Sequence, residues 1–286
     1  MIWVIFSVLS GLGDAISYAI IKKLSKLDKM LALASRYLIA LPFILLAFLF
    51  YDVPKVSLYF YIVVIVDTIV ALAGIYLMIK SLEHSDLSSS IPMLSFSPIF
   101  LIVVSFIVLK ELPNLFGLTG ITMVVIGSYI LNIKSIRNGY LEPFRTIFKD
   151  KGIFYMFVVS FLFSISATVG KIGILLSNPA YFTFMVYLAS SIMILPFCFK
   201  NIRKKAVAIK SNVNYILILG ISTAAMEILY AIAVKYALVS YTISLKRASV
   251  IFSVIIGFFV FKEKNFKVKI AGTILMFAGA ALIILS

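Results

Sequence analysis

The sequence predicts an all-α integral membrane protein with ten transmembrane helices, arranged as two inverted five-helix repeats. Three observations predict this fold: the composition, the spacing of the apolar segments, and a motif that occurs twice. Of the 286 residues, 63% are hydrophobic and 13% are charged, whereas a soluble domain is about half apolar and about a quarter charged. So many apolar side chains cannot be covered by so little polar surface, and the bilayer is therefore the expected solvent.

The apolar segments divide the chain into ten predicted spans. A span needs about 20 apolar residues, at a rise of about 1.5 Å each, to cross a hydrocarbon core of about 30 Å. The predicted spans are residues 2–22, 31–50, 57–79, 88–109, 115–133, 153–175, 180–199, 213–235, 241–261 and 267–285. No stretch between them is long enough for a soluble domain. Residues 1–6 carry no positive charge, so we expect the first span to remain as an anchor.

The charges predict the orientation. The net charge is +15, which in a soluble chain would suggest nucleic acid, but most of the 26 lysines and arginines lie in the odd-numbered loops between spans. Lysine and arginine accumulate in cytoplasmic loops. We therefore expect a multi-pass protein of the cell membrane with both termini outside and no nucleic-acid partner. The basic middle loop is expected to contact anionic membrane lipid.

A repeated motif predicts an internal duplication. The segments KELPNLFGLTGITMVVIG (110–127) and KEKNFKVKIAGTILMFAG (262–279) share a Lys-Glu pair and glycines 10 and 17 positions after the lysine. Similar composition alone is the alternative, but the shared spacing favours duplication. We predict a first repeat at 1–133, a basic cytoplasmic linker at 134–152 and a second repeat at 153–286. Because five spans are an odd number, the second copy enters the membrane from the opposite side.

The segment YLMIKSLEHSDLSSSIPMLSFSPIFLIVVSFIVLKE, the glycine pair after it and their second-half counterparts resemble the drug/metabolite transporter superfamily, and more narrowly its EamA-type members. The resemblance covers almost the whole chain and implies ten helices, a central cavity and alternating access without ATP. YAIIKKL and ASRYLIALPF also resemble that family, with Lys22 and Arg36 at its basic positions, and Arg36 is therefore a substrate-binding candidate. Ser190 stands where Arg36 would repeat, so no symmetric role is expected.

Lys246 and Arg247 lie side by side in TISLKRASVIFSV, a run that is otherwise apolar or small. Each charge would cost about 2.5–3.5 kcal/mol at the bilayer centre. Three interpretations are open: the pair snorkels to the outer interface, it is buried in an ion pair with Glu227, or it faces a wet cavity and binds an anion. Arginine offers an oxyanion a planar fork and lysine a point charge. The segment is similar to the ninth helix of plastid phosphate translocators, which implies that both residues bind the substrate's anionic group.

Three acids lie inside predicted spans: Asp14, Asp67 and Glu227. An ionisable residue inside the membrane is a functional-site candidate by default, and burial favours a neutral carboxyl, so each acid is a proton-coupling candidate. Glu227 is favoured because Tyr230 follows one turn later, and both are substrate-binding candidates. Since no basic residue lies within one turn of Glu227, we expect a lone buried carboxyl there. The alternative for each acid is a hydrogen-bonded or ion-paired packing residue.

Two further features concern packing. The fourth span contains Pro92, Pro98 and several serines, which predicts either a kinked helix that lines a cavity or a kink whose serines bond to their own backbone. The repeated glycines give one small face to each of two helices. That face predicts close packing within one molecule or between two, so the chain is expected to be a monomer or a homodimer.

No set of residues indicates catalysis. His84 is the only histidine and Cys198 the only cysteine, so there is no zinc-like cluster and no nucleophile–histidine–acid set beyond that one histidine. We expect no enzyme, no metal and no cofactor. The expected function is secondary transport, more in the direction of export, of a small anionic or zwitterionic metabolite. The alternatives are a flippase for a phosphate-linked lipid and a non-transporting membrane assembly subunit.

Overall fold

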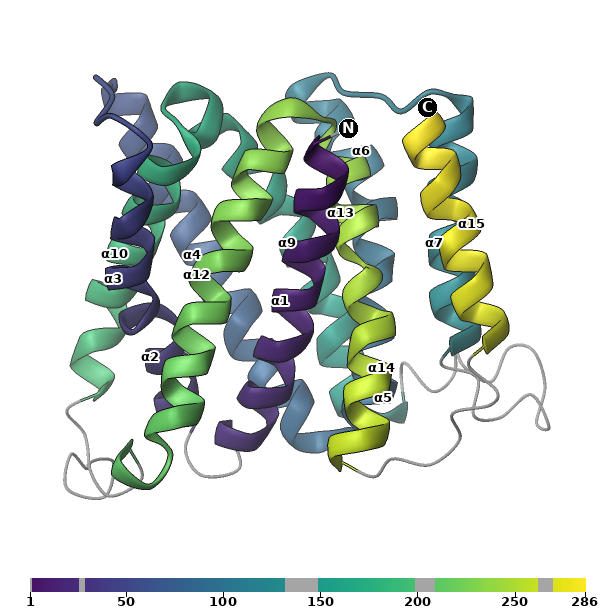
Figure 1. The fold of residues 1–286 in the computed structure, drawn as a ribbon. Coiled ribbons are helices and arrows are strands. Elements are labelled where there is room, and N and C mark those ends of the chain that lie inside the picture. The colour runs from purple at the N-terminus through teal and green to yellow at the C-terminus, as the bar shows by residue number, and fades with distance from the viewer. Residues whose placement is uncertain (1, 26–28, 132–148, 199–208, 262–269) are drawn as a thin grey trace.

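The computed structural model describes residues 2–25, 29–131, 149–198, 209–261 and 270–286, and every regular element in these ranges is a helix (Figure 1). Six segments are long and apolar enough to cross a membrane. They are α1 (Ile2–Ser25), the run of α2 (Lys29–Leu38), α3 (Ala40–Leu45) and η1 (Leu46–Leu49), α4 (Leu58–His84), α9 (Lys151–Leu176), α10 (Pro179–Cys198) and α12 (Val213–Tyr236). The all-α prediction is confirmed.

Shorter helices occupy the other four predicted spans. They are α5 (Leu87–Ser90) with η2 (Ile91–Phe96) and α6 (Ser97–Leu109), α7 (Leu115–Leu131), α13 (Val239–Lys246) with α14 (Ala248–Phe261), and α15 (Ile270–Leu285). Because these are short or interrupted, the count of ten crossings stays a prediction. Both chain ends lie at the same end of the bundle (Figure 1), as an even number of crossings requires.

The fourth predicted span is broken in the way that its prolines indicate. Proline has no N–H to donate to the helix ladder, and the chain changes from α-helix to a 3₁₀ turn at η2 before α6 resumes. Ser97 Oγ donates to Leu94 O at 2.6 Å and Ser105 Oγ to Leu101 O at 2.6 Å. Ser97 therefore bonds to its own backbone, whereas the Ser90 and Ser95 hydroxyls are buried without a hydrogen-bond partner in the described part, so the alternative in which the serines bond to their own backbone holds for only some of them. The side chains of Ser88, Ser89 and Pro92 lie outside the described part.

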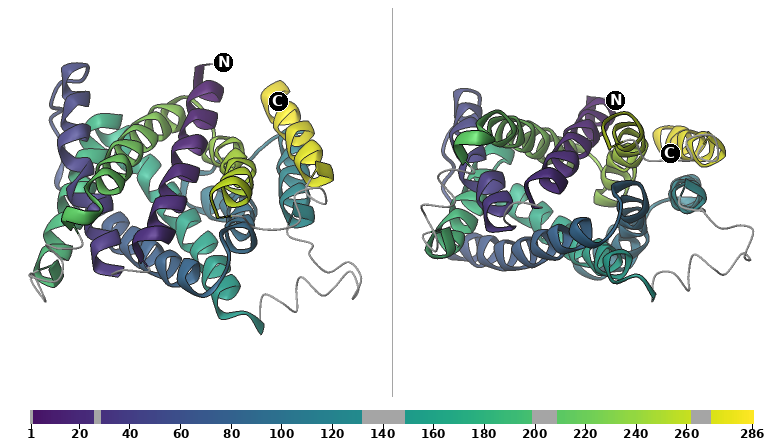
Figure 2. Two further views of the ribbon diagram at one scale, coloured as in Figure 1. Left: turned by 60° about the horizontal axis from the view of Figure 1, so that its bottom comes forward. Right: turned by 90° about the horizontal axis from the view of Figure 1, so that it is seen from below.

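The helices of the two repeats make equivalent contacts. Helix α1 packs along α12, and α9, its counterpart, packs along α4, the counterpart of α12 (Figure 2). The last helices of the two repeats, α7 and α15, pack against each other. Gly120 lies opposite Gly279, and Gly127 lies opposite Gly272, so α7 and α15 run antiparallel. This is the arrangement expected of two inverted copies.

The outer surface suits lipid. Leu49, Phe50 and Leu115 are 78%, 83% and 80% exposed, and many other large apolar side chains face outward from the bundle. Large exposed apolar patches are rare on soluble monomers and mark surfaces that contact a membrane or a partner. The interior combines fully buried apolar side chains, such as Ile21 and Met78, with many buried serines and charged residues.

The start of the second repeat differs slightly from the prediction. Helix α9 begins at Lys151, two residues before the predicted span, because Asp150 caps it: its Oδ1 accepts from Gly152 N at 2.8 Å and from Ile153 N at 3.0 Å. An aspartate in this position satisfies backbone donors that the helix leaves free. Residues 132–148, most of the predicted linker, lie outside the described residues.

We expect Gly120→Ala to destabilise the protein. A Cβ at Gly120 would lie 2.7 Å from Gly279 O and 2.8 Å from Ile283 Cγ1, and backbone atoms cannot yield cheaply. Overpacking of this kind costs about 1–3 kcal/mol, so thermal unfolding in detergent should shift to a lower temperature. Gly170→Ala is the control, since its Cβ would meet nothing closer than Phe182 Cε1 at 3.5 Å. Equal melting temperatures for the two variants would contradict the packing.

Candidate functional site

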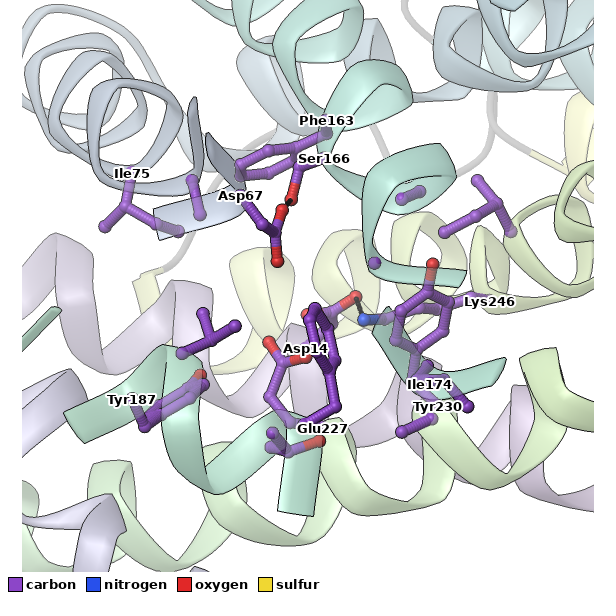
Figure 3. A pocket seen from close by; sticks show the side chains of 18 of the residues that line it. Asp14, Asp67, Ile75, Phe163, Ser166, Ile174, Tyr187, Glu227, Tyr230 and Lys246 are labelled. Carbon is purple, nitrogen blue, oxygen red and sulfur yellow. Dashed lines mark hydrogen bonds and ion pairs between the residues drawn. The ribbon is translucent and has the colours of Figure 1, made fainter. Parts of the chain in front are cut away.

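A cavity of about 120 Å³ lies between the two repeats, lined by α1, α2 and α4 from the first and by α9, α10, α12 and α13 from the second (Figure 3). Every residue singled out from the sequence as a site candidate lines it. These residues are Asp14, Arg36, Asp67, Glu227, Tyr230, Lys246 and Arg247. They come from five separate segments of the chain, so the fold gathers the charges that the sequence scatters.

Lys246, at the end of α13, reaches a carboxylate inside the cavity. Its Nζ lies 3.4 Å from Asp14 Oδ2, and 4.5 Å from the centre of the Tyr230 ring. The Lys246 and Asp14 side chains are 9% and 4% exposed. The structure therefore contradicts two interpretations open from the sequence: Lys246 neither snorkels to the interface nor pairs with Glu227.

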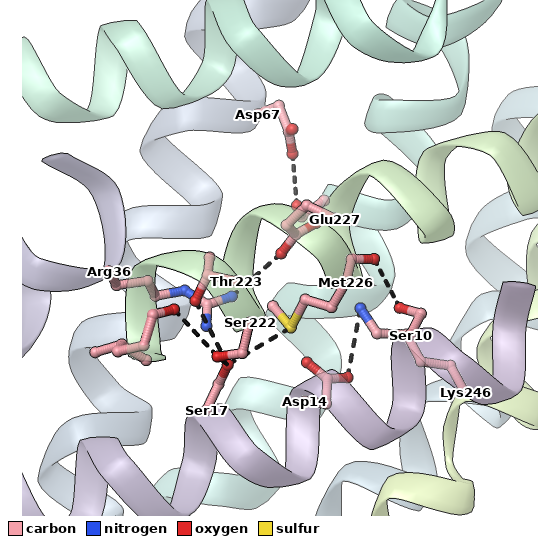
Figure 4. Close-up of polar contacts among 12 residues, drawn as sticks. Ser10, Asp14, Ser17, Arg36, Asp67, Ser222, Thr223, Met226, Glu227 and Lys246 are labelled. Carbon is pink, nitrogen blue, oxygen red and sulfur yellow. Dashed lines mark hydrogen bonds and ion pairs between the residues drawn. The ribbon is translucent and has the colours of Figure 1, made fainter. Parts of the chain in front are cut away.

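Asp14 is held in place by contacts of α1 with α12. One turn before it, Ser10 Oγ donates to Met226 O at 2.8 Å, and one turn after it, the Ser17 hydroxyl lies 3.0 Å from that of Ser222 (Figure 4). These hydrogen bonds fix the face of α1 that carries Asp14. The acid is ion-paired, which is one of the alternatives weighed for it.

Arg247 lies where the ninth predicted span is interrupted, between α13 and α14. Its Nε and Nη2 donate to Ser97 Oγ at 3.1 and 2.7 Å, and the residue is 2% exposed. Arg247 therefore does not snorkel either. The interruption lies against α1, because a Cβ at Gly11 would be 2.6 Å from Lys246 O.

Arg36 is the partner of Glu227. Arg36 Nη2 donates to Glu227 Oε1 at 3.2 Å (Figure 4). The expectation of a lone carboxyl at Glu227 is wrong. It considered only residues within one helical turn of Glu227, and the cation that pairs with it lies on α2, in the other repeat. Arg36 Nε and Nη1 are buried without a hydrogen-bond partner in the described part. The hydroxyl of Tyr230, which lines the same cavity, is also buried without a described partner.

Asp67, on α4, is the third carboxylate. Ser166 Oγ on α9 donates to Asp67 Oδ1 at 2.5 Å, and Asp67 is 5% exposed. Within the described ranges no cation lies at ion-pair distance from it. Figure 3 shows its carboxylate directed across the cavity, opposite Asp14 and Glu227. Asp67 thus differs from the other two acids, each of which faces a basic side chain.

Several lining residues were missed from the sequence. Tyr18, Tyr37 and Tyr187 line the cavity together with Ser166, and the Tyr37 and Tyr187 rings lie 4.9 Å apart between centroids. Tyr18 follows Asp14 by four positions and so shares its helix face, which is a signal that was available. The others have no such signal, because they come from helices whose orientation the sequence does not determine.

Another buried ion pair, in addition to the two in the cavity, lies outside it, near the chain ends. Lys171 Nζ pairs with Glu111 and donates to Ala237 O at 2.7 Å. Glu111 Oε2 accepts from Val239 N at 3.1 Å. The pair joins α9, the connection between α6 and α7, and the turn between α12 and α13. At the other end of the bundle, Lys22, the repeat equivalent of Lys171, lies 3.9 Å from Asp86.

Comparisons with known proteins agree with the two-repeat fold. The model of the EamA-like transporter family matches residues 1–133 and 150–285. A solved structure, described only as the crystal structure of a protein, superposes with a TM-score of 0.66 at 14% identity, covering 98% of this chain and 96% of its own. At that identity the likeness shows the fold alone. A search of curated proteins finds no match.

Proposed function

Because the chain belongs to the EamA-like transporter family, we propose that it is a secondary transporter that moves a small anionic or zwitterionic metabolite through the charged cavity. One observation carries the choice of substrate class: Arg36, Lys246 and Arg247 all line a cavity inside the bundle. Each cation inside a membrane costs about 2.5–3.5 kcal/mol on insertion scales. Guanidinium and ammonium groups are the side chains that bind oxyanions best.

The mechanism that we propose is alternating access. The cavity is lined by both repeats, so a rocking motion of one repeat against the other would open it first to one side of the membrane and then to the other. Ten crossings, with both termini outside, are part of the same proposal. The driving ion in it is a proton carried by a cavity carboxylate, for which Asp14, Asp67 and Glu227 are the candidates.

Counterflow in liposomes tests this function. The purified protein is reconstituted without ATP into liposomes loaded with a mixture of amino acids, carboxylates and organic phosphates, and labelled compounds are added outside one at a time. We expect at least one labelled compound to accumulate above the level in protein-free liposomes. If none exchanges, or if exchange needs ATP, the proposed function is wrong.

A further inference from the structure

A buried apolar layer, here called the terminal layer, lies between the cavity and the end of the bundle that carries both chain termini (Figure 1). Both repeats contribute to it, and its members include Phe60, Val63, Leu101, Phe182, Val234 and Val239. On α4, Phe60 and Val63 precede Asp67, which lines the cavity, by about two turns and about one turn. On α13, Val239 precedes the lining residue Ile243 by about one turn. The terminal layer therefore closes the cavity on this side.

The Lys171–Glu111 pair fastens the two repeats together at this layer. Glu111 belongs to the first repeat and Lys171 to the second, and both side chains are largely buried. Glu111 Oε2 accepts from Val239 N at 3.1 Å. Lys171 Nζ donates to Ala237 O at 2.7 Å. The pair therefore holds the turn between α12 and α13 in place, and with it the fully buried side chain of Val239 in the terminal layer.

The pair also lies between two hollows. On its outer side is a second pocket, whose lining includes Trp3, Lys171, Lys235, Ala237 and Tyr241. On its inner side, Gly170, the neighbour of Lys171 on α9, lines the cavity. A solute that moves from the outer pocket to the cavity must therefore pass the ion pair and the terminal layer.

An ion pair and an apolar layer respond differently to water, so together they can form a closure with two states. Two unit charges attract each other several times more strongly at low dielectric than in water, so the pair holds while the layer stays dry. Once water enters, both charges are hydrated and their separation costs little. A buried ion pair is weak evidence for stability, because an apolar pair of similar volume often stabilises as well, whereas a switch is a well-attested use of such a pair.

We infer that the Lys171–Glu111 pair is the latch of a gate. It keeps the cavity closed at the end that carries the termini, and it separates when the cavity opens there. This inference rests on the proposed function, in which the cavity opens to one side of the membrane at a time.

The inverted repeat supplies an equivalent pair at the other end of the bundle. Lys22, the repeat equivalent of Lys171, is buried and lies 3.9 Å from Asp86. Asp86 immediately precedes α5, the counterpart of α13, and Glu111 binds the first residue of α13. At both ends, therefore, a buried lysine meets an acid at the start of a short helix. This is the symmetry expected if the same device closes each side in turn.

The test measures access to the cavity without any substrate. In a Cys198→Ser background, Ala71→Cys places one thiol in the cavity. Its reaction with a membrane-impermeant maleimide is timed from each side of the membrane, in intact cells and in inside-out vesicles. A separate Ser286→Cys variant, exposed at the chain end, identifies the preparation that presents the terminal side. Lys171→Met/Glu111→Gln removes the latch, and it should raise the labelling rate of Ala71→Cys from that side at least about 10-fold.

Two further variants control this measurement. Lys29→Met/Glu83→Gln makes the same substitutions in a pair that joins α2 to α4 within the first repeat, so it should leave the labelling rate from the terminal side unchanged. Val63→Ala weakens the gate through its apolar layer, because the smaller side chain leaves room for water, and it should raise that rate. Melting temperatures identify the variants that fold.

The outcomes decide the inference separately from the proposed function. The latch is wrong if Lys171→Met/Glu111→Gln folds and its labelling rate stays the same, or if Lys29→Met/Glu83→Gln raises the rate equally. If the first double variant does not fold, Val63→Ala decides alone, and an unchanged rate overturns the gate. Labelling needs no transport. Exchange in counterflow with unchanged labelling would therefore leave the proposed function standing without this gate, whereas faster labelling without any exchange would support the gate and refute transport.

Discussion

Lys171→Met should lower the free energy of unfolding by about 3–5 kcal/mol, because it leaves a buried carboxylate without its cation. The Lys171 and Glu111 side chains are 9% and 15% exposed. Without Lys171, the only hydrogen bond that the Glu111 carboxylate keeps among the described residues is the one from Val239 N. The loss should appear as a large shift of the unfolding midpoint when SDS is titrated into mixed micelles and followed by circular dichroism.

Two controls identify the cause of that loss. The double variant Lys171→Met/Glu111→Gln removes both charges, so it should recover most of the lost stability. Lys29→Met makes the same substitution in the Lys29–Glu83 pair, whose N–O distance is 2.8 Å but whose lysine is 39% exposed. An exposed pair contributes about 0–1 kcal/mol. Equal losses for Lys171→Met and Lys29→Met would show that burial of the first pair does not matter.

The spans and their pairing into repeats could be predicted because both signals are local. Length and hydropathy identify a membrane helix without knowledge of its neighbours. Pro92 and Pro98 in turn predict the break between α5 and α6. The second break, at Arg247, has no proline or glycine. It is held by contacts from elsewhere in the chain: the Gly11 region of α1 against Lys246 O, and Ser97 against the guanidinium. The local sequence around Arg247 therefore does not predict this break.

The candidate residues could be predicted, but their partners could not. A charge inside an apolar run is conspicuous, so Asp14, Asp67 and Glu227 can each be identified from their own segment, and Arg36 is a candidate through the resemblance of its segment to the family. Which acid meets which base depends on how α1, α2, α12 and α13 are rotated and placed against one another. The Arg36–Glu227 pair joins residues 191 positions apart. For that reason a carboxyl that is isolated in its own helix turned out to be paired across the two repeats.

The observed ion pairs give different roles to Lys246 and Arg247, which the sequence does not distinguish. Lys246 neutralises Asp14, so Lys246→Gln leaves a buried carboxylate and should lower stability as well as binding. Arg247 neutralises no acid within the described ranges, and Ser97 Oγ still donates to Leu94 O when the guanidinium is removed. Arg247 variants should therefore fold with little change in melting temperature, and a loss of function in them can be assigned to the substrate.

Arg247→Gln should then weaken substrate binding by about one to two decades, since a hydrogen bond to a charged group contributes about 1.5–3 kcal/mol. Arg247→Lys should also weaken binding, although it keeps the charge, because an ammonium cannot reproduce the planar fork that reaches Ser97 and an oxyanion together. The measurement is titration of both variants with the labelled compound that exchanges in the counterflow assay. Near-native affinity in both variants would mean that the anionic group lies elsewhere in the cavity. A collapse of stability without ligand would mean that Arg247 holds α13, α14 and α6 together rather than binding the substrate.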